Sequence, residues 1–388
     1  MDAPSPIRLR ILDALRGLAA LYVVVGHARY LLHEGFATGY RLHPGDYSLW
    51  QKMAVHALTL FGWGHEAVIL FFVLSGFAIH LRFAREQAEL GSKAPFHPGT
   101  YFRRRIKRLY PPLLLALALT FGLDALGAHF RLPIHPMVGP VTHDAPTLLG
   151  NLAFAMDNWG QAPFACFGTD KPLWSLRYEA AFYLFYPLLW LLNRRSAWLA
   201  MAATLTMALL LAWMPAHGAS SLDLLRKPLE LLFVWWLGGF LAEVFTGRVR
   251  LPMKGLAVLA LCLPFGLRRP GTEVAFAPKP YDMWLLGLGF FGLMAACLAW
   301  HPILDRSRLT GFFAKLGDCS YTLYVIHMPI LVLLGGWLMS RTSDGEPPCS
   351  LLWVLPGVAL CVTLAWLMHF IVETPFTGGG KKAVKKQS

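Results

Sequence analysis

The chain has few charged residues for its length, and the acidic residues among them are outnumbered by the basic ones. Only 15% of its 388 residues are Asp, Glu, Lys or Arg, whereas a soluble domain typically carries about 25%. This deficit excludes a surface that faces water on every side. The 35 basic residues outnumber the 22 acidic ones, for a net charge of +13. Because they lie between apolar runs rather than on one face, they favour membrane orientation and no nucleic acid partner.

Several signatures of soluble enzymes and metal sites are also absent. The six cysteines form no CxxC pair, and the sequence contains no P-loop, no G-x-S-x-G and no H-E-x-x-H. No metal site is therefore predicted. Most cysteines lie in apolar runs, where Cys behaves as a small hydrophobic residue. Cys166 and Cys349 fall in loops, and the spacing alone leaves a disulfide between them open.

Long apolar runs are what the chain does contain. A membrane-spanning helix needs about 20 mostly apolar residues, and its backbone groups must be paired within the segment. The runs therefore predict an all-α bundle of about ten transmembrane helices over residues 1–376, followed by a basic cytoplasmic tail at 377–388. The predicted spans are 12–32, 66–82, 109–128, 176–193, 196–214, 229–246, 251–267, 283–300, 319–340 and 351–372.

Lys and Arg gather in alternate segments between these spans. The segments before the first span, after the last, and at every second connection hold more than twice as many Lys and Arg as the remaining loops. Short cytoplasmic loops carry such an excess. The pattern predicts that both termini are cytoplasmic and that the number of spans is even. The longest loop on the opposite side would then run from about residue 129 to 175.

The first span contains two ionisable residues, Arg16 and His27. Eleven residues are about three helical turns, so both side chains project from one face, roughly 16 Å apart along the axis. In a structural interpretation Arg16 reaches lipid phosphates and His27 bonds a backbone carbonyl. In a functional interpretation Arg16 contacts an anionic donor and His27 acts as a general base.

A dense group of cations precedes the third span, where five of the six residues 103–108 are Arg or Lys. A cytoplasmic anchor is one interpretation. The other is a site for a phosphorylated ligand, because the planar guanidinium groups of Arg105 and Arg108 match phosphate oxygens. Pro111 and Pro112 predict a helix start at this point, since the first turn needs no N–H from these residues.

Further polar residues lie at the fourth and ninth spans. Trp174 and Tyr178 are typical of a membrane interface. Glu179 is explained either by a salt bridge to Arg177 and the helix dipole or by a functional role. His327 is a lone histidine in its span, for which packing and a second catalytic or donor-orienting role both remain open.

Six short motifs follow one another along residues 7–376. They are Leu12–Ala20 with His27; Phe71–Phe77; Arg105 and Arg108 with Tyr110-Pro111; Leu173–Leu176 with Glu179 and Phe182-Tyr183; Ser320-Tyr321 with Tyr324 and His327; and Glu373-Thr374-Pro375. Together they resemble the membrane-bound acyltransferase family 3. The sequence departs from the family pattern after Glu179, where a second Glu and a Gln are replaced by Ala180 and Ala181.

The resemblance implies a ten-helix enzyme of the inner (cytoplasmic) membrane. Such enzymes usually move acetyl from cytoplasmic acetyl-CoA to a hydroxyl of a cell-surface glycan or its lipid-linked precursor. His27 would remove the acceptor proton or accept the acyl group transiently. By this comparison Arg16, Arg105 and Arg108 hold CoA phosphates, His27, Glu179 and His327 are catalytic, and Trp174 and Tyr178 stack on the sugar.

Two points of function stay open at this stage. The acyl group could be delivered directly to the acceptor or passed to a separate periplasmic partner. The alternative function is a transporter or flippase for an anionic or sugar substrate, which predicts internal repeats that the sequence does not show. A membrane scaffold would not need Arg16, His27 and the arginine cluster together.

Overall fold

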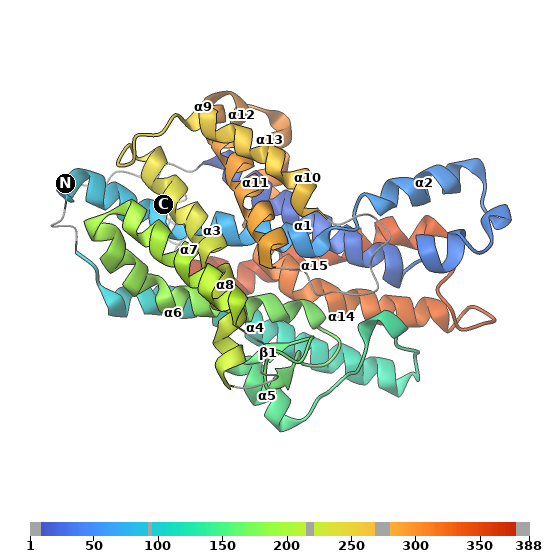
Figure 1. Cartoon of the computed structure of the whole chain (residues 1–388). Helices are drawn as coiled ribbons and strands as arrows, with labels where there is room; N and C mark the ends of the chain where they lie inside the picture. Colours follow the sequence, from blue (N-terminus) through green and yellow to red (C-terminus); the bar gives the residue numbers. More distant parts are fainter. Residues whose placement is uncertain (1–8, 92–94, 215–220, 268–279, 378–388) are drawn as a thin grey trace, which may run out of the picture.

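The fold is an all-α bundle (Figure 1), as the sequence predicted. The computed structural model describes residues 9–91, 95–214, 221–267 and 280–377. Within these ranges the strands are limited to one short parallel pair, β1 (Met156–Asp157) and β2 (Phe164–Ala165). The predicted basic tail lies outside the described residues apart from residue 377.

Nine of the ten predicted spans coincide with single long helices. These are α1 (Arg10–Leu31), α3 (Gly64–Leu90), α4 (Pro98–His129), α6 (Trp174–Arg195), α7 (Ala197–Trp213), α8 (Ser221–Phe245), α11 (Pro280–Ala299), α14 (Ser320–Met339) and α15 (Val354–Val372). The seventh predicted span is broken instead, into α9 (Met253–Leu256), a 3-10 segment (Ala257–Cys262) and α10 (Leu263–Gly266).

Seven helices are long and apolar enough to cross a membrane by length and composition. They are α1, α3, α4, α8, α11, α14 and α15. The α7 helix and the broken α9–α10 segment are apolar but shorter. The α6 helix has the length, but Arg177 and Glu179 lower its mean hydropathy. The protein is thus a multi-pass membrane protein, and the full count of ten spans remains a prediction.

Short helices in the connections complete the fold. α2 (Leu49–Thr59) protrudes at the right-hand end of the view in Figure 1 and begins with a capping box between Ser48 and Gln51. The sequence analysis did not predict these elements, since none is long enough to span. The others are α5 (Ala145–Leu152), α12 (His301–Leu304), α13 (Arg308–Asp318), which packs on α1, and α16 (Thr374–Thr377).

The centre of the bundle is built on the contact between α3 and α8. A Cβ atom added at Gly76 would lie 1.9 Å from the Trp235 carbonyl oxygen, and one at Gly238 would lie 1.9 Å from that of Val73. Only glycine permits this approach of the two backbones, as at many helix contacts in membranes. The α14 helix packs between α1 and α4 and thereby brings residues from both ends of the chain to one site.

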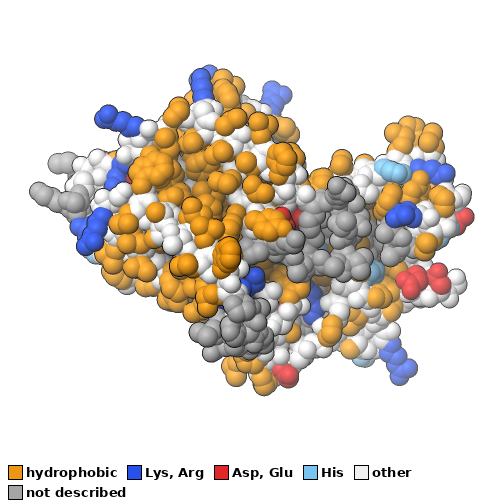
Figure 2. All heavy atoms as spheres, in the orientation of Figure 1, with side chains coloured by type: hydrophobic (Ala, Val, Ile, Leu, Met, Phe, Trp, Pro, Cys, Tyr) orange, Lys and Arg blue, Asp and Glu red, His pale blue; other side chains and the backbone are white. Residues whose placement is uncertain are grey.

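The outer surface is apolar over much of its area. Figure 2 shows a broad field of hydrophobic side chains on one face, with Lys and Arg at its margins. A soluble monomer rarely exposes so large an apolar surface. This face fits a lipid environment. Exposed large side chains include Leu209, Leu210 and Trp213 of α7 and Leu355, Trp366 and Ile371 of α15.

The start of α4 differs from the prediction. The helix begins at Pro98 and continues through Pro111 and Pro112, so these prolines are internal. The preceding turns are held by packing, because Tyr101 is buried and its hydroxyl donates to the Tyr183 carbonyl, 3.1 Å away. Such packing compensates for the backbone hydrogen bonds that the prolines remove. The arginine cluster therefore lies on a helix that is anchored in the bundle.

The pairing of Cys166 and Cys349 that the sequence left open is not formed. Both are free thiols, and Cys166 is fully buried whereas Cys349 is exposed.

The predicted topology can be tested with reporter fusions. A fusion at residue 388 should report the cytoplasm, and one within residues 129–175 should report the opposite side, because Lys and Arg concentrate in the segments assigned to the cytoplasm. The measurement is the activity of a compartment-sensitive reporter at each position. Reporters that signal the same side at both positions would contradict the ten-span topology.

Candidate functional site

A cavity of about 600 Å³ opens among α1, α3, α4, α6 and α14. We call it the arginine cavity, because four arginines line it. Glu179 is the only carboxylate among its described lining residues, so the cavity is strongly cationic and suits an anionic ligand. Its polar lining comprises Arg16, Ser75, Arg104, Arg105, Arg108, Ser175, Glu179, Tyr183, Ser320, Tyr321 and Tyr324.

Two of these arginines are held by aromatic rings. Arg105 and Arg108 are three residues apart on α4 and therefore share a helical face. The Arg105 guanidinium lies 5.6 Å from the Tyr101 ring centroid and 5.4 Å from that of Tyr183, and the Arg108 guanidinium lies 5.4 Å from that of Tyr321. Cation–π contacts fix guanidinium groups without using their N–H donors. The Arg105 Nε has no hydrogen-bond partner among the described residues.

Arg16 lies in the same cavity. Its guanidinium pairs with Asp13 one turn earlier on α1, 3.2 Å from the carboxylate oxygen, and its side chain remains 23% exposed. The structure thus brings together the three arginines that the sequence assigned to donor binding. It separates Arg16 from His27, which lines a different cavity.

Glu179 accepts hydrogen bonds from the Tyr183 hydroxyl and, at 3.5 Å, from the Ser75 hydroxyl. The proposed salt bridge between Glu179 and Arg177 is wrong. The Arg177 guanidinium instead lies 3.0 Å from Asp157 of β1, and both side chains are buried. Arg177 and Glu179 are two residues apart on a helix, so their side chains do not face each other.

A second cavity of about 310 Å³ adjoins the first. We call it the histidine cavity, because His27 lines it. The indole of Trp174 lies in its wall, stacked on His65 with ring centroids 4.5 Å apart. Aromatic planes of this kind suit the apolar face of a sugar ring. The polar and aromatic lining comprises His27, Arg29, Tyr30, Phe61, His65, Asn158, Trp159, Lys171, Trp174 and Tyr324.

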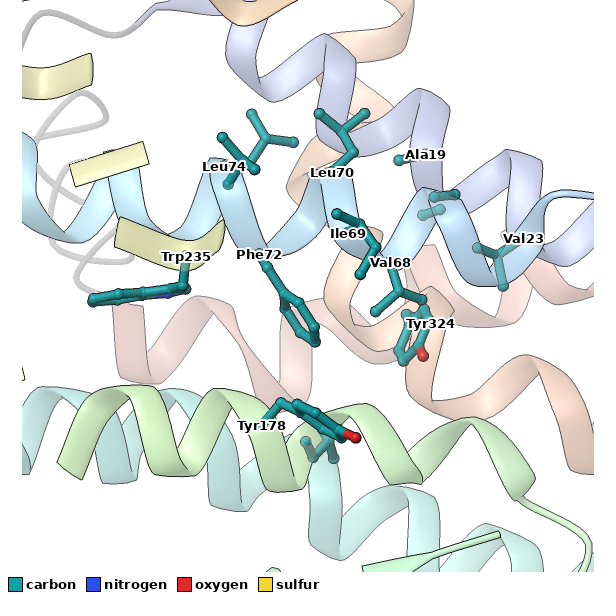
Figure 3. Close-up of a cluster of buried hydrophobic side chains, with 14 of the residues drawn as sticks. Ala19, Val23, Val68, Ile69, Leu70, Phe72, Leu74, Tyr178, Trp235 and Tyr324 are labelled. Carbon is teal, nitrogen blue, oxygen red and sulfur yellow. The ribbon is translucent and has the colours of Figure 1, made fainter. Parts of the chain in front are cut away.

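Tyr178 lies elsewhere. It is buried, lines neither cavity, and its ring stacks on Phe72 with centroids 5.8 Å apart (Figure 3). Trp174 and Tyr178 are four residues apart on α6, and their rings meet edge to face. In the structure Trp174 therefore reaches a cavity wall, whereas Tyr178 supports it from behind.

His27 and His327 form a hydrogen-bonded pair, with 2.9 Å between His27 Nδ1 and His327 Nε2. His327 Nδ1 lies 2.7 Å from the Tyr324 carbonyl oxygen and 3.2 Å from that of Leu323. Since carbonyl oxygens only accept, His327 Nδ1 must carry a proton. In a neutral His327 ring, Nε2 is then a bare acceptor, so His27 Nδ1 must donate to it.

This arrangement fixes the tautomer of His27. With its proton on Nδ1, a neutral His27 ring has its lone pair on Nε2. His27 can therefore take a proton at the histidine cavity. His327 is fully buried and lines neither cavity, so it acts on His27 rather than on a ligand. Sequence spacing could not reveal this pair, because its members lie on α1 and α14, 300 residues apart.

A second buried network lies near the far end of α3. His80 contacts the Tyr186 hydroxyl at 2.9 Å and Glu243 at 2.5 Å. Asn193 donates to the same Glu243, and Arg248 pairs with its other oxygen at 2.7 Å. The partners of His80 come from α6, α8 and the turn after α8, so the network ties these elements to α3.

Glu373, from the last motif, has a local role. It follows α15 directly and accepts hydrogen bonds from the backbone N–H and the hydroxyl of Thr322, at 2.9 and 2.5 Å. A carboxylate at the first turn of α14 satisfies donors that have no partner within the helix. This bond positions the helix that carries Tyr321, Tyr324 and His327.

Comparison with known proteins finds acyltransferases that match nearly the whole chain. The model of acyltransferase family 3, described as an acyltransferase domain, matches residues 9–370. Acyltransferase MdmB of Streptomyces mycarofaciens is 27% identical over 96% of this chain and 92% of its own length. A protein of Staphylococcus aureus strain MRSA252, provisionally named an O-acetyltransferase, is 21% identical over 97% of this chain and 58% of its own.

This chain spans little more than half of the Staphylococcus aureus relative. A protein of Rhizobium radiobacter named for its place in the picA locus is 29% identical over 40% of this chain and 64% of its own length. No solved structure matches. The family match over nearly the whole chain is decisive, and the protein belongs to acyltransferase family 3 and is a multi-pass membrane acyltransferase.

Proposed function

We propose that the protein transfers an acetyl group from cytoplasmic acetyl-CoA to a hydroxyl of a cell-surface carbohydrate or its lipid-linked precursor, in the inner membrane. The observation that carries this proposal is the His27–His327 pair. It leaves His27 Nε2 able to take a proton at the histidine cavity, and the cationic arginine cavity adjoins that cavity. The arginine cavity would bind the donor and the histidine cavity the acceptor. A separate periplasmic partner could take the product onward.

Donor binding would use the cations of the arginine cavity. Arg16, Arg105 and Arg108 line it together, and charge-assisted hydrogen bonds from guanidinium groups to phosphates are strong and directional. A volume of about 600 Å³ lies within the range of small-molecule sites. Glu179 would orient the donor arginines and Tyr183 rather than meet the phosphates directly.

Transfer would take place where the two cavities meet. The acceptor oxygen attacks the thioester carbonyl carbon while its proton passes to His27 Nε2. The new C–O bond forms, the C–S bond breaks, and the CoA sulfur leaves as a thiolate that takes up the proton from His27. His327 would hold His27 in the required tautomer and stabilise its protonated form, as the third member of a catalytic triad does for a histidine.

Labelled acetyl-CoA gives the most direct test. Membrane vesicles containing the protein should retain label on glycan or lipid when incubated with acetyl-CoA labelled in the acetyl group. A transporter would leave no covalent label. Mass spectrometry of surface glycans from a deletion strain would then identify the acceptor by the loss of an acetyl group. Vesicles that retain no label would argue against the proposed donor.

The arginine cavity leads to a separate prediction for donor affinity. Arg105→Ala and Arg108→Ala should each weaken acetyl-CoA binding by about 1.5–3 kcal/mol, roughly 10- to 150-fold in Kd, because each removes a charge-assisted hydrogen bond. Arg108→Lys should restore little, since an ammonium group cannot reproduce a bidentate guanidinium. The measurement is equilibrium binding of acetyl-CoA to the purified protein.

Arg103→Ala is the matched control for these variants. Arg103 belongs to the same cationic turn of α4, but it is exposed and does not line the cavity. Its removal should leave the Kd within about twofold of the wild type. An equal loss for Arg103 and Arg108 would indicate that the cluster acts only through its total charge.

A further inference from the structure

We propose that Val68 and Tyr324 form the partition between the arginine cavity and the histidine cavity, and that the passage between them restricts the transferred acyl group to a short chain. The inference rests on the proposed function and adds to it the residues that select the acyl group. It starts from the two linings, because Val68 and Tyr324 are the residues common to both.

The two side chains lie side by side where the cavities meet. Val68 lies on α3 and Tyr324 on α14, and Figure 3 shows Val68 beside the Tyr324 ring, with the tyrosine hydroxyl pointing away from it. Both are at least nine-tenths buried. A donor in one cavity and an acceptor in the other can therefore meet only where these side chains leave room.

Tyr324 is held firmly in this position. Its hydroxyl donates to the Pro172 carbonyl, 3.1 Å away, and its ring packs edge to face on Phe71 with centroids 5.8 Å apart. Its own carbonyl accepts the hydrogen bond from His327 Nδ1. The side chain of Tyr324 thus forms the partition while its backbone carbonyl positions the histidine pair. The reaction and the passage of the acyl group therefore lie at the same place.

Val68 is similarly rigid. Its β-branched side chain has one strongly preferred rotamer on a helix, and its neighbours Ile69 and Phe72 are buried with it in the core of the bundle. A wall made of a fixed aromatic ring and a fixed branched side chain does not adjust to longer substrates. An acetyl group needs space for only one methyl beyond the carbonyl, whereas each further methylene must displace the wall.

The transfer step explains why the passage selects the acyl group. The acceptor oxygen must reach the thioester carbon at His27, while the CoA sulfur stays on the arginine side and leaves there with the acceptor proton that His27 passes on. Only the acyl group crosses between Val68 and Tyr324. A hydrophobic pocket discriminates one methylene by about 10- to 200-fold, and this site is expected to act in that range.

Val68→Ala is the test. Removing two methyl groups should raise the ratio of butyryl to acetyl transfer, as kcat/KM, by at least about 10-fold over the wild type. The probes are acetyl-CoA and butyryl-CoA, each labelled in the acyl group, added to membrane vesicles from cells that make the natural acceptor. Val73→Ala is the matched control, because Val73 is a fully buried valine of the same helix that lines neither cavity.

A further variant keeps the test decisive if Val68→Ala is unstable. Val68→Ile narrows the passage and should lower acetyl transfer at least about 10-fold while acetyl-CoA still raises the melting temperature as in the wild type.

An unchanged ratio in Val68→Ala, or an unchanged acetyl rate in Val68→Ile, with an active wild type, overturns the partition and leaves the proposed function standing. A wild type that transfers neither acyl group overturns both.

Discussion

His27→Gln is expected to lower acyl transfer by about 10²–10⁴-fold while the protein still inserts, folds and binds acetyl-CoA. Glutamine can keep a hydrogen bond to His327, but its amide cannot take a proton near neutral pH. General acid–base catalysis typically contributes a factor of this size. Donor affinity should be unaffected, because His27 lines the histidine cavity and the arginines line the other. The measurement is acetyl transfer by the purified variant, together with its melting temperature in detergent.

His56→Gln is a suitable control for this substitution. His56 lies on the peripheral helix α2 and is exposed. Its ring bonds the Lys52 carbonyl and packs edge to face on Phe36 and Tyr40, away from both cavities. Its replacement should leave transfer within about twofold of the wild type. Substantial activity in a stable His27→Gln protein would show that the imidazole is structural and that the acceptor proton leaves by another route.

The hydrogen bond between His27 and His327 predicts different losses of transfer for two substitutions of His327. In His327→Gln the amide oxygen can still accept the hydrogen bond from His27 Nδ1, so transfer should fall less than in His27→Gln. In His327→Leu that acceptor is lost, and the loss should be larger than in His327→Gln. A shift in the pH profile of transfer should accompany both, because His327 contacts the titrating ring. A purely structural His327 would alter stability without moving the profile.

The fold was predictable because the membrane imposes it. Backbone groups in lipid must pair within a segment, so every long apolar run becomes a helix, and nine of ten predicted spans are single helices. Prediction was less successful where packing decides. α6 can carry Arg177 because a carboxylate of β1 and a backbone carbonyl of α8 accept its hydrogen bonds. α4 continues through two prolines because Tyr101 anchors its earlier turns to α6.

The site was only partly predictable for a related reason. The sequence could place Arg105 and Arg108 on one face of a helix, and the structure places Arg16 beside them. The sequence could not predict that Arg16 and His27 line different cavities. The cavity that each side chain lines depends on how α3 and α14 pack against α1. Contacts between distant segments, such as His27 with His327, leave no periodic signal in the sequence.

Asp157→Ala is expected to destabilise the protein by about 3–5 kcal/mol, the typical result of leaving one partner of a buried ion pair uncompensated. Arg177 and Asp157 are each only 2% exposed, with 3.0 Å between their charged atoms. Arg177 also donates to the carbonyls of Asp223 and Leu224, so it joins α6, α8 and the β1 loop. The free energy of unfolding in detergent, from denaturant or thermal curves, is the quantity to measure.

A control and a double variant separate charge from general loop disruption. Asp344→Ala removes a carboxylate from an exposed turn, where its hydrogen bonds are local, to the Glu346 backbone N–H and to Thr342. This substitution should leave the free energy of unfolding nearly unchanged. Asp157→Leu combined with Arg177→Met removes both charges and should be less destabilising than Asp157→Ala, because no buried charge is left unpaired. Equal losses in the single and double variants would contradict this account.

The same ion pair connects stability to the site. Asp157 accepts hydrogen bonds from the backbone N–H groups of Trp159 and Gln161, at 2.6 and 2.8 Å. Trp159 and Asn158 line the histidine cavity, so the loop that Asp157 fixes is one wall of the proposed acceptor site. At temperatures where the Asp157→Ala protein is still folded, its KM for acceptor should rise while its Kd for acetyl-CoA stays unchanged. A loss confined to donor affinity would place the function of this loop at the other cavity.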